Sequence, residues 1–290
     1  MTSYDGSPAL PRMRLGAELR RLREERSLRL EDVAARLDVA PSTLSRIENG
    51  KAPARTSYVA AILDLFGVAD EVQREALARL ARQGQRKNWF AEHADLLPAG
   101  ASDYLGLESA ATGISFHAAQ AVPGPLQIPD YAAAVCRASR AGLSKAGITS
   151  LAAIQRRRQE LLLRDRRELR LVIDESALRR VVGTTAVTAG QLKHLAAIAA
   201  AGAVTIQAIP LAAARTVLAP AFTMLALGGG PVSAVAWTSG ILGQVTVTTR
   251  AQDVSHAAET FRALTRSALP PDASARLIGH LAEHFQDTRD

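Results

Sequence analysis

The sequence has little of what an extracellular or membrane-spanning protein needs. It contains one cysteine, Cys136, among 290 residues, which excludes an internal disulfide framework and a structural zinc site built from Cys/His spacing. No window reaches the roughly 18 to 20 consecutive apolar residues of a membrane helix, and the N-terminus MTSYDGSPALPRMR lacks the apolar core of a signal peptide. We therefore expect a cytoplasmic, nucleoid-associated protein rather than a secreted one.

Charge is the first positive signal. The formal net charge is +7, and residues 1–87 hold 16 Lys and Arg against 12 Asp and Glu, so this segment carries +4 of the total. Lys and Arg release counterions from phosphate backbones, which makes nucleic acid a fitting partner for a basic segment. Charge alone does not distinguish DNA binding from other uses, so the pattern of the segment has to decide.

The N-terminal part has a helical pattern throughout. From Leu15 to Gln83, apolar residues recur at spacings of three and four and are interrupted only by brief turns. Pro41 suits the first turn of a helix, and Asn49-Gly50 is a usual helix stop. We predict five helices that form a compact domain: residues 14–26, 30–37, 41–48, 57–66 and 70–82.

A change of composition separates this part from the rest. Residues 84–106 are interrupted by Gly, Pro and Ser and predict a linker, although Trp89 and Phe90 indicate that it docks on a neighbouring surface. Helical patterns then alternate with runs rich in β-branched residues. We predict strands over residues 169–174, 204–209, 222–227, 232–237 and 243–249, and helices over 107–120, 129–140, 150–166, 175–182, 189–201, 252–266 and 273–285.

Two of the N-terminal helices, residues 30–37 and 41–48, are joined by a tight turn, as in helix-turn-helix units whose second helix lies in the DNA major groove. Leu44 and Ile47 belong to its buried face. Arg side chains contact guanine there, and hydroxyls contact bases or phosphates. The outward side chains near the base edges are Ser42, Thr43, Ser45 and Arg46, and the later Asn49, Lys51 and Arg55 are placed for the phosphate backbone.

The predicted architecture therefore has two domains, which agrees with the length of the chain. A flexible N-terminus over residues 1–13 precedes an all-α helix-turn-helix domain of five helices over residues 14–83. The linker over residues 84–106 leads to a mixed α+β domain with about five strands over residues 107–290.

The stretch LRRLREERSLRLEDVAARLDVAPSTLSRIENGKAP closely resembles the xenobiotic-response-element (Xre) type of helix-turn-helix regulators, the group that includes phage repressors. The resemblance covers residues 19–66 and is most specific in the SxxSRIENGK element and in Val33-Ala34 of the second helix. It implies a phage-repressor-like fold and DNA binding through the helix over residues 41–48.

The same resemblance implies a structural ion pair. In that family an Arg of the first helix pairs with the Glu of ENG, and these positions are Arg23 and Glu48 here. The family's Gln at the start of the second helix is Leu30 in this chain, so we expect Arg29 to replace it as a phosphate ligand. Pro41 leaves no polar side chain at the first position of the recognition helix. We therefore expect this helix to read fewer base edges than is usual in the family.

Further along, ESAATGISFHAAQAVPGPLQIPDYAAAV, RRRQELL, VIDESALRRVVG, QLKHL and VTIQAIP follow one another in that order. Together they resemble the C-terminal domain of WhiJ-like regulators from actinobacteria over most of residues 88–285, although the family's LLQT reads PLQI here. In such regulators this domain follows a helix-turn-helix domain, is described as antitoxin-like and is linked to a small partner protein encoded nearby. The resemblance implies a developmental or secondary-metabolism regulator modulated by a protein partner.

The VPGP run at residues 122–125 predicts a turn, because Pro fixes φ and Gly admits positive φ. Polar residues of the second domain would surround this turn, either as structural support or as a partner or ligand site. Both interpretations stay open for Glu108, Pro123, Gly124, Gln127, Tyr131, Arg158, Gln159, Asp174, Glu175 and Arg179.

No catalytic constellation is evident. HLAEH at residues 280–284 matches the H-x-x-E-H pattern of inverted zinc peptidases, but a third ligand must come from elsewhere. A terminal amphipathic helix explains the segment without metal. Ser115 has no GxSxG context, and the isolated His117 and His194 suit surface or core positions. We expect no enzymatic activity, no metal and no cofactor.

Three functions remain open. The first is a homodimeric regulator that binds a palindromic operator and is modulated through its second domain. The second is an antitoxin-like protein-binding module with secondary DNA binding, and the third is a regulator gated by a small apolar molecule. Candidate dimer contacts are the fifth helix, the Trp89-Phe90 segment and the strand near Trp237.

Overall fold

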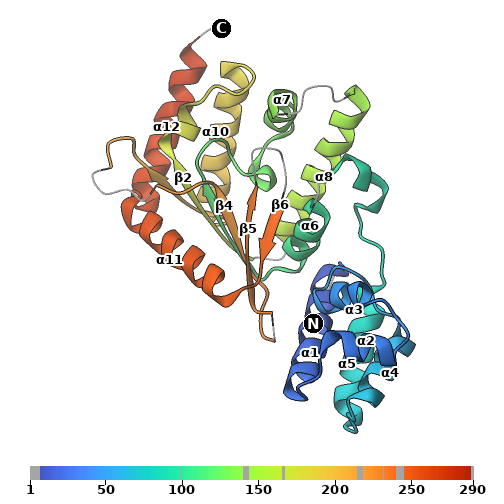
Figure 1. Cartoon of the computed structure of the whole chain (residues 1–290). Helices are drawn as coiled ribbons and strands as arrows, with labels where there is room; N and C mark the ends of the chain where they lie inside the picture. The colour runs from blue at the N-terminus through green and yellow to red at the C-terminus, as the bar shows by residue number, and fades with distance from the viewer. Residues whose placement is uncertain are drawn as a thin grey trace. The chain divides into compact units, whose positions relative to one another are not determined.

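The computed structural model describes residues 7–98, 100–139, 144–164, 167–213, 218–230, 232–239 and 245–288, which divide into two compact units. The first consists of the N-terminal residues up to Glu92 with the segments Asp103–Ala110 and Leu227–Ser233, and the second holds the rest. Figure 1 shows helices alone at the N-terminal end of the chain and a sheet with helices in the C-terminal part. The predicted fold class, an all-α domain followed by an α+β domain, is confirmed.

Five helices build the N-terminal part of the first unit: α1 (Ala9–Glu25), α2 (Leu30–Arg36), α3 (Pro41–Glu48), α4 (Thr56–Leu65) and α5 (Glu71–Gly84). Their apolar stripes meet in one core, because helical spacing of three and four puts the buried residues on one face of each helix. α1 begins five residues before its predicted start, so residues 9–13, predicted as part of a flexible N-terminus, are helical. The core contains Leu15, Leu19, Leu22, Val33, Leu44, Ile47, Val59, Ile62, Leu63, Phe66 and Leu77.

The backbones of α1 and α3 lie close together at Gly16. A Cβ atom at this position would lie 2.4 Å from the carbonyl oxygen of Ile47 and 2.6 Å from that of Glu48. These are backbone atoms, which cannot rotate aside as a side chain can. Glycine at residue 16 therefore allows the end of α3 to rest directly on α1.

Part of the predicted linker is structured. A 3₁₀ helix, η1, spans Ala91–Leu96, and α6 spans Ala101–Ala110. Phe90 is 1% exposed, and its ring packs edge-on against that of Trp89. The indole nitrogen of Trp89 donates a hydrogen bond to Oγ of Ser109 at 3.2 Å. Both aromatic residues are thus packed within the first unit.

A six-stranded sheet forms the centre of the second unit. Its strands are β1 (Gly113–Ala118), β2 (Glu168–Asp174), β3 (Thr205–Ile209), β4 (Phe222–Ala226), β5 (Ala234–Ser239) and β6 (Val245–Thr248). The order is β3-β2-β1-β4-β5-β6. β1, β2 and β3 are parallel, whereas β4, β5 and β6 pair antiparallel with their neighbours.

β1 corrects one prediction. The helix predicted over residues 107–120 is wrong in its second half, because α6 ends at Ala110 and Gly113–Ala118 is a strand between β2 and β4. Short apolar runs fit either period, and pairing on both sides decides for the strand. The strand predicted over residues 243–249 begins outside the described residues, and its described part is β6.

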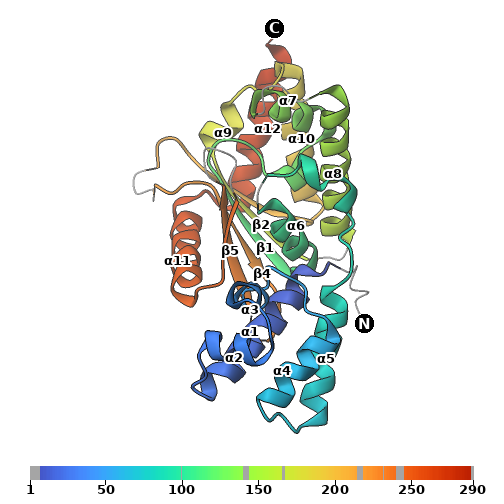
Figure 2. The ribbon, with the colours of Figure 1, turned by 45° about the vertical axis from the view of Figure 1, so that its right-hand side comes forward.

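Helices cover the sheet on both sides (Figures 1 and 2). On one face, Phe261 and Leu264 of α11 pack on Val172 and Phe222 of the sheet, and both figures show α8 on the opposite side. α10 packs against α12, which borders β3. The helices are α7 (Pro129–Ser139), α8 (Lys145–Arg164), α9 (Glu175–Arg179), α10 (Thr185–Ala200), α11 (Ala251–Ser267) and α12 (Pro271–Asp287), with the 3₁₀ turn η2 (Gly124–Leu126) before α7.

Replacing Gly16 by alanine should weaken the contact between α1 and α3. In an open helical site the change would stabilise by roughly 0.5 to 1 kcal/mol, because alanine has the higher helix propensity. At Gly16 the clash with backbone carbonyls reverses the sign. Hydrogen exchange followed by mass spectrometry should show faster exchange in α1 and α3 of the Gly16→Ala variant.

Gly279→Ala in α12 is the matched control, since a Cβ there would meet no atom within 4 Å. Gly279→Ala should leave amide exchange in α1 and α3 unchanged and should leave exchange in α12 unchanged or slower. Equal protection of α1 and α3 in the two variants would contradict the role assigned to Gly16.

Candidate nucleic-acid interface

The candidate interface is built on α2 and α3, which a four-residue turn connects. The turn closes α2 through hydrogen bonds from the backbone N–H of Leu37 to Val33 O at 3.1 Å and from that of Val39 to Ala34 O at 3.0 Å. Asp38 adopts a φ of 52°, a left-handed conformation that Asp tolerates better than most residues. Pro41 occupies the first turn of α3, where its missing N–H costs nothing.

α3 presents polar side chains on the face opposite its core contacts. Leu44 and Ile47 are buried, whereas Ser42, Thr43 and Arg46 are exposed. Among the described residues, Ser42, Thr43 and Arg46 have no side-chain hydrogen bond or ion pair. Their donors and acceptors are therefore available to a partner outside the protein.

The basic residues predicted to flank this helix lie at the ends of neighbouring helices. Arg29 precedes α2 and Arg55 precedes α4, and both side chains are exposed. Lys51 follows α3, and its ammonium lies 2.6 Å from a carboxylate oxygen of Asp103 in α6. Arg29 and Arg55 are thus open to solvent, while Lys51 already holds a surface ion pair.

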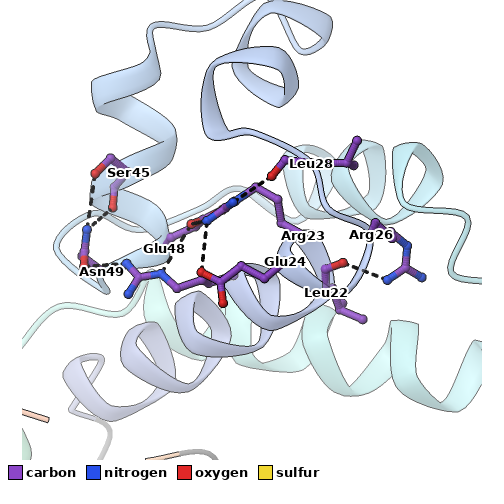
Figure 3. A network of polar contacts seen from close by, with 9 residues as sticks. Leu22, Arg23, Glu24, Arg26, Leu28, Ser45, Glu48 and Asn49 are labelled. Atoms are coloured by element: carbon purple, nitrogen blue, oxygen red, sulfur yellow. Dashed lines mark hydrogen bonds and ion pairs between the residues drawn. The ribbon is translucent and has the colours of Figure 1, made fainter. Parts of the chain in front are cut away.

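Arg23 and Glu48 join α1 to the end of α3 (Figure 3). Nε of Arg23 donates to Oε1 of Glu48 at 2.7 Å and Nη2 donates to Oε2 at 2.9 Å, a bidentate pair. The third nitrogen, Nη1, donates to the carbonyl oxygen of Leu28 at 2.9 Å. The side chain of Glu48 is 1% exposed and that of Arg23 is 12% exposed, so solvent screens the pair little.

The hydrogen bond to Glu48 raises the pKa of Arg23, which stays charged. A buried carboxylate is tolerated only when it is paired and hydrogen-bonded. Arg20 supplies a second cation, with Nε 3.5 Å from Oε2 of Glu48. Arg20 is absent from the predicted site, although its place one turn before Arg23 on the same face of α1 is the signal that would have identified it.

Asn49 is exposed, but both ends of its side-chain amide bond to other residues of the protein. Its Oδ1 accepts a hydrogen bond from Nη2 of Arg20 at 2.7 Å. Its Nδ2 donates to the carbonyl oxygen of Ser45 at 2.7 Å and lies 3.3 Å from the Ser45 hydroxyl. Figure 3 shows the amide facing Ser45 across the last turn of α3. The side chain predicted to donate to a phosphate is therefore already engaged.

The VPGP turn of the second unit is supported by buried amides. Gln127 donates through Nε2 to Val122 O at 2.7 Å. Gln191 of α10 is 0% exposed, accepts from the backbone N–H of Ile128 at 2.8 Å and donates to Leu126 O at 2.8 Å. Gln191 thus satisfies a donor and an acceptor of the turn at once, a role that its distance in sequence hides.

Gly124 permits a close approach to α8, because a Cβ there would lie 2.6 Å from Nε2 of Gln155 and 2.9 Å from Nη1 of Arg158. The other predicted residues of this domain have the following places. Pro123 begins the turn, and Tyr131 is buried, which raises its pKa. Nε2 of Gln159 lies 3.3 Å from Nε2 of His194. Oε2 of Glu108 accepts a hydrogen bond from the hydroxyl of Tyr104 at 2.5 Å.

Glu175 anchors the segment that follows β3. Its Oε2 accepts from the backbone N–H of Leu211 at 2.8 Å, and its Oε1 lies 2.7 Å from Arg179. Burial raises the pKa of Glu175, but the hydrogen bonds from Leu211 and Arg179 outweigh it and leave the pKa lowered. The neighbouring Asp174 has a raised pKa because of burial, an effect that His117 opposes.

Two protein families match the chain. Residues 14–77 match a family described as a helix-turn-helix domain, and residues 101–280 match one described as a domain of unknown function (DUF5753). The chain belongs to the DUF5753 family. Comparison with curated proteins and with solved structures gave no match. Since the first unit of this DUF5753 protein carries the helix-turn-helix domain, the chain is a DNA-binding regulator.

The zinc-peptidase pattern of the DUF5753 region falls on α12. Ile278, Leu281 and Phe285 of that helix are buried, whereas His280 and His284 are exposed. Throughout the described ranges, no group of three or more His, Cys, Asp or Glu residues is placed to hold a metal ion. In the same ranges, no helix has both the length and the apolar character needed to span a membrane.

Breaking the Arg23–Glu48 pair of the DUF5753 protein from one side should destabilise the first unit strongly. Arg23→Ala leaves a buried carboxylate without its main partner, which typically costs about 3 to 5 kcal/mol. Arg21→Ala is the matched control, because Arg21 of the same helix is 47% exposed and pairs with Glu18 and Glu25 on the surface. It should cost less than about 1 kcal/mol.

Urea titration monitored by hydrogen exchange in α1 and α3 measures the free energy of unfolding of both variants. Replacing the two partners together by leucine should recover most of the loss, since no charge is then stranded. Similar stability of Arg23→Ala and Arg21→Ala would show that Glu48 does not depend on Arg23.

Replacing Gln191 by the similarly shaped methionine should loosen the VPGP turn of the DUF5753 region. The change strands the N–H of Ile128 and the carbonyl of Leu126, and a buried unpaired group costs about 1 to 3 kcal/mol. Amide exchange of residues 122–128 should accelerate. Gln286→Met on the exposed side of α12 is the control, and equal exchange in both variants would count against the structural role of Gln191.

Proposed function

We propose that this DUF5753 protein is a sequence-specific transcriptional regulator of the Xre type that binds a palindromic operator as a homodimer. The observation that carries the proposal is the face of α3, where Ser42, Thr43 and Arg46 are exposed and have no hydrogen-bond partner among the described residues. In a soluble helix such side chains are commonplace. On the second helix of a helix-turn-helix domain they are the groups that meet base edges.

In this proposal the residues divide by task. Ser42, Thr43, Ser45 and Arg46 read base edges, because hydroxyls and guanidinium groups match base acceptors. Arg29 and Arg55 bind phosphates on either side of the helix. The Arg23–Glu48 pair holds α3 on its buried side and makes no contact with DNA.

Lys51 takes part as a third phosphate ligand once it leaves Asp103. The two side chains are 55% and 37% exposed, and an ion pair of this exposure contributes at most about 1 kcal/mol. A DNA phosphate of the same sign can replace the carboxylate at little cost. Asp103 therefore moderates the affinity of Lys51 for DNA without blocking it.

The C-terminal domain, in the same proposal, is the antitoxin-like, WhiJ-like module of an actinobacterial regulator and takes a small protein partner encoded nearby. The support is the ordered set of motifs shared with that group. The buried amides around residues 122–128 favour a structural role for the VPGP turn, so the partner surface is sought elsewhere in this domain.

Arg46→Ala should remove specific DNA binding. One bidentate Arg–guanine contact is worth about 1 to 3 kcal/mol, so affinity for the selected site should fall roughly 5- to 150-fold. Arg79→Ala, which removes an exposed arginine of α5, is matched in charge and should have little effect. The site is first selected by the wild-type protein from random duplexes, and affinities are then measured by fluorescence anisotropy at fixed salt.

Two further readouts separate this proposal from a pure protein-binding role. Proteins that co-purify from a lysate of the source cells should be the same for wild type and Arg46→Ala. The selected site should contain half-sites about one helical turn, roughly 34 Å, apart if the dimer is symmetric. Equal affinities of the two arginine variants, or no enrichment of any sequence by wild type, would overturn specific DNA reading.

A further inference from the structure

We infer that Arg20 and Asn49 fix the hydroxyl of Ser45 as a hydrogen-bond donor toward DNA. The inference deepens the proposed function and rests on it. It makes Ser45 a specificity-determining residue for an acceptor atom on the DNA. Arg20 and Asn49 become positioning residues that act through Ser45.

The orientation of the Asn49 amide follows from its two partners. A guanidinium group only donates hydrogen bonds, so the atom that faces Nη2 of Arg20 at 2.7 Å has to be Oδ1. A backbone carbonyl only accepts, so the atom that faces Ser45 O at 2.7 Å has to be Nδ2. The two requirements agree, and one orientation of the amide remains.

That orientation determines the direction of the Ser45 hydroxyl. Nδ2 of Asn49 also approaches Oγ of Ser45 at 3.3 Å, and an amide nitrogen is a donor. Oγ therefore accepts this bond with a lone pair and keeps its own proton. A serine hydroxyl has one proton and two lone pairs, so the bond from Asn49 occupies one lone pair and leaves the proton and the second lone pair unused.

The Ser45 hydroxyl also does not donate to a backbone carbonyl of its own helix, as helical hydroxyls commonly do. Hydroxyls in helices commonly donate to the carbonyl four residues earlier. Ser109, Thr265 and Ser267 do so here, at 2.8, 2.8 and 3.2 Å respectively. Within the described part of the chain, Ser45 makes no such bond, so its proton is available to a partner outside the protein.

Arg20 strengthens this arrangement from the far end. Its Nε lies 3.5 Å from Oε2 of Glu48, the carboxylate that also holds Arg23. Glu48 thus keeps the guanidinium in place, and the cation polarises the Asn49 amide. Hydrogen bonds in such a chain reinforce one another, which makes the Ser45 hydroxyl a better donor than an isolated serine.

With one lone pair engaged by Asn49 and its proton unused, the Ser45 hydroxyl favours acceptor atoms over donors. In the major groove the acceptors are N7 and O6 of guanine, N7 of adenine and O4 of thymine, whereas the amino groups of adenine and cytosine are donors. A phosphate oxygen is an acceptor too. The common chemistry is an acceptor atom within reach of the last turn of α3.

A double-mutant cycle with neutral changes tests the inference. Ser45→Ala should weaken binding to the selected site on the order of 5-fold, the net effect of one hydrogen bond. Asn49→Ala alone should have a similar effect. In the Ser45→Ala background it should have almost none, because Asn49 acts only through Ser45. Independent effects that multiply would mean that Asn49 touches DNA directly and would overturn the inference.

Modified DNA with the wild-type protein provides the second arm, which does not depend on how well Asn49→Ala folds. Duplexes carrying 7-deazapurine at single positions remove N7 acceptors, and methylphosphonate linkages remove a phosphate charge and acceptor. One modification should weaken wild type about 5-fold and leave Ser45→Ala unaffected, and its type tells base from phosphate. Guanine replaced by 2-aminopurine removes O6, and 4-thiothymine weakens the O4 acceptor, so these substitutions complete the set of acceptors. If no single modification distinguishes the two proteins, Ser45 is not a donor to DNA.

Different results test the proposed function and the role of Ser45. Selection of a sequence by wild type, lost in Arg46→Ala, supports specific binding whatever the cycle shows. Failure of the cycle with selection intact removes only the role of Ser45 and its two positioning residues. Failure of selection itself removes the proposed function.

Discussion

Glu48 places a carboxylate, 1% exposed, at the last turn of α3, the helix proposed to contact DNA. Burying that charge is costly, and the cost is offset only because Arg23 grips both oxygens and Arg20 stands close by. Both arginines belong to α1. The ion pair with Glu48 thus fixes the position of α3 relative to α1. Gly16 lets the two backbones approach closely enough for this pair to form.

The same carboxylate organises the polar surface next to it. Arg20, held near Glu48, bonds the Asn49 amide, and that amide closes on Ser45. A buried structural pair is therefore continuous with a surface residue proposed to read DNA. Polar chains of this kind restrict which way each donor points, so the interior of the domain decides what its surface can recognise.

The DUF5753 region shows how polar residues that suggest a binding site in the sequence can be structural. Its glutamines, above all Gln191, supply the donors and acceptors that the VPGP turn leaves open, and Gly124 makes room for α8. Glu175 performs a similar task for the segment after β3. Such contacts specify the fold of the domain, and they direct the search for a partner surface toward exposed residues.

Local pattern determined most of the first unit in advance. Helical spacing, Pro41 and the Asn49-Gly50 stop predict α2 and α3 because each signal acts within one or two turns of the chain. β1 could not be predicted this way, since a short apolar run fits both helix and strand until β2 and β4 pair with it. Likewise Arg20 meets Asn49, and Gln191 meets the turn, across 29 and about 65 residues of chain. For α2 and α3, sequence by itself determined which residues are helical, basic and outward-facing. Only the tertiary structure decided which amide holds which hydroxyl, because that depends on distances between elements that local spacing does not encode.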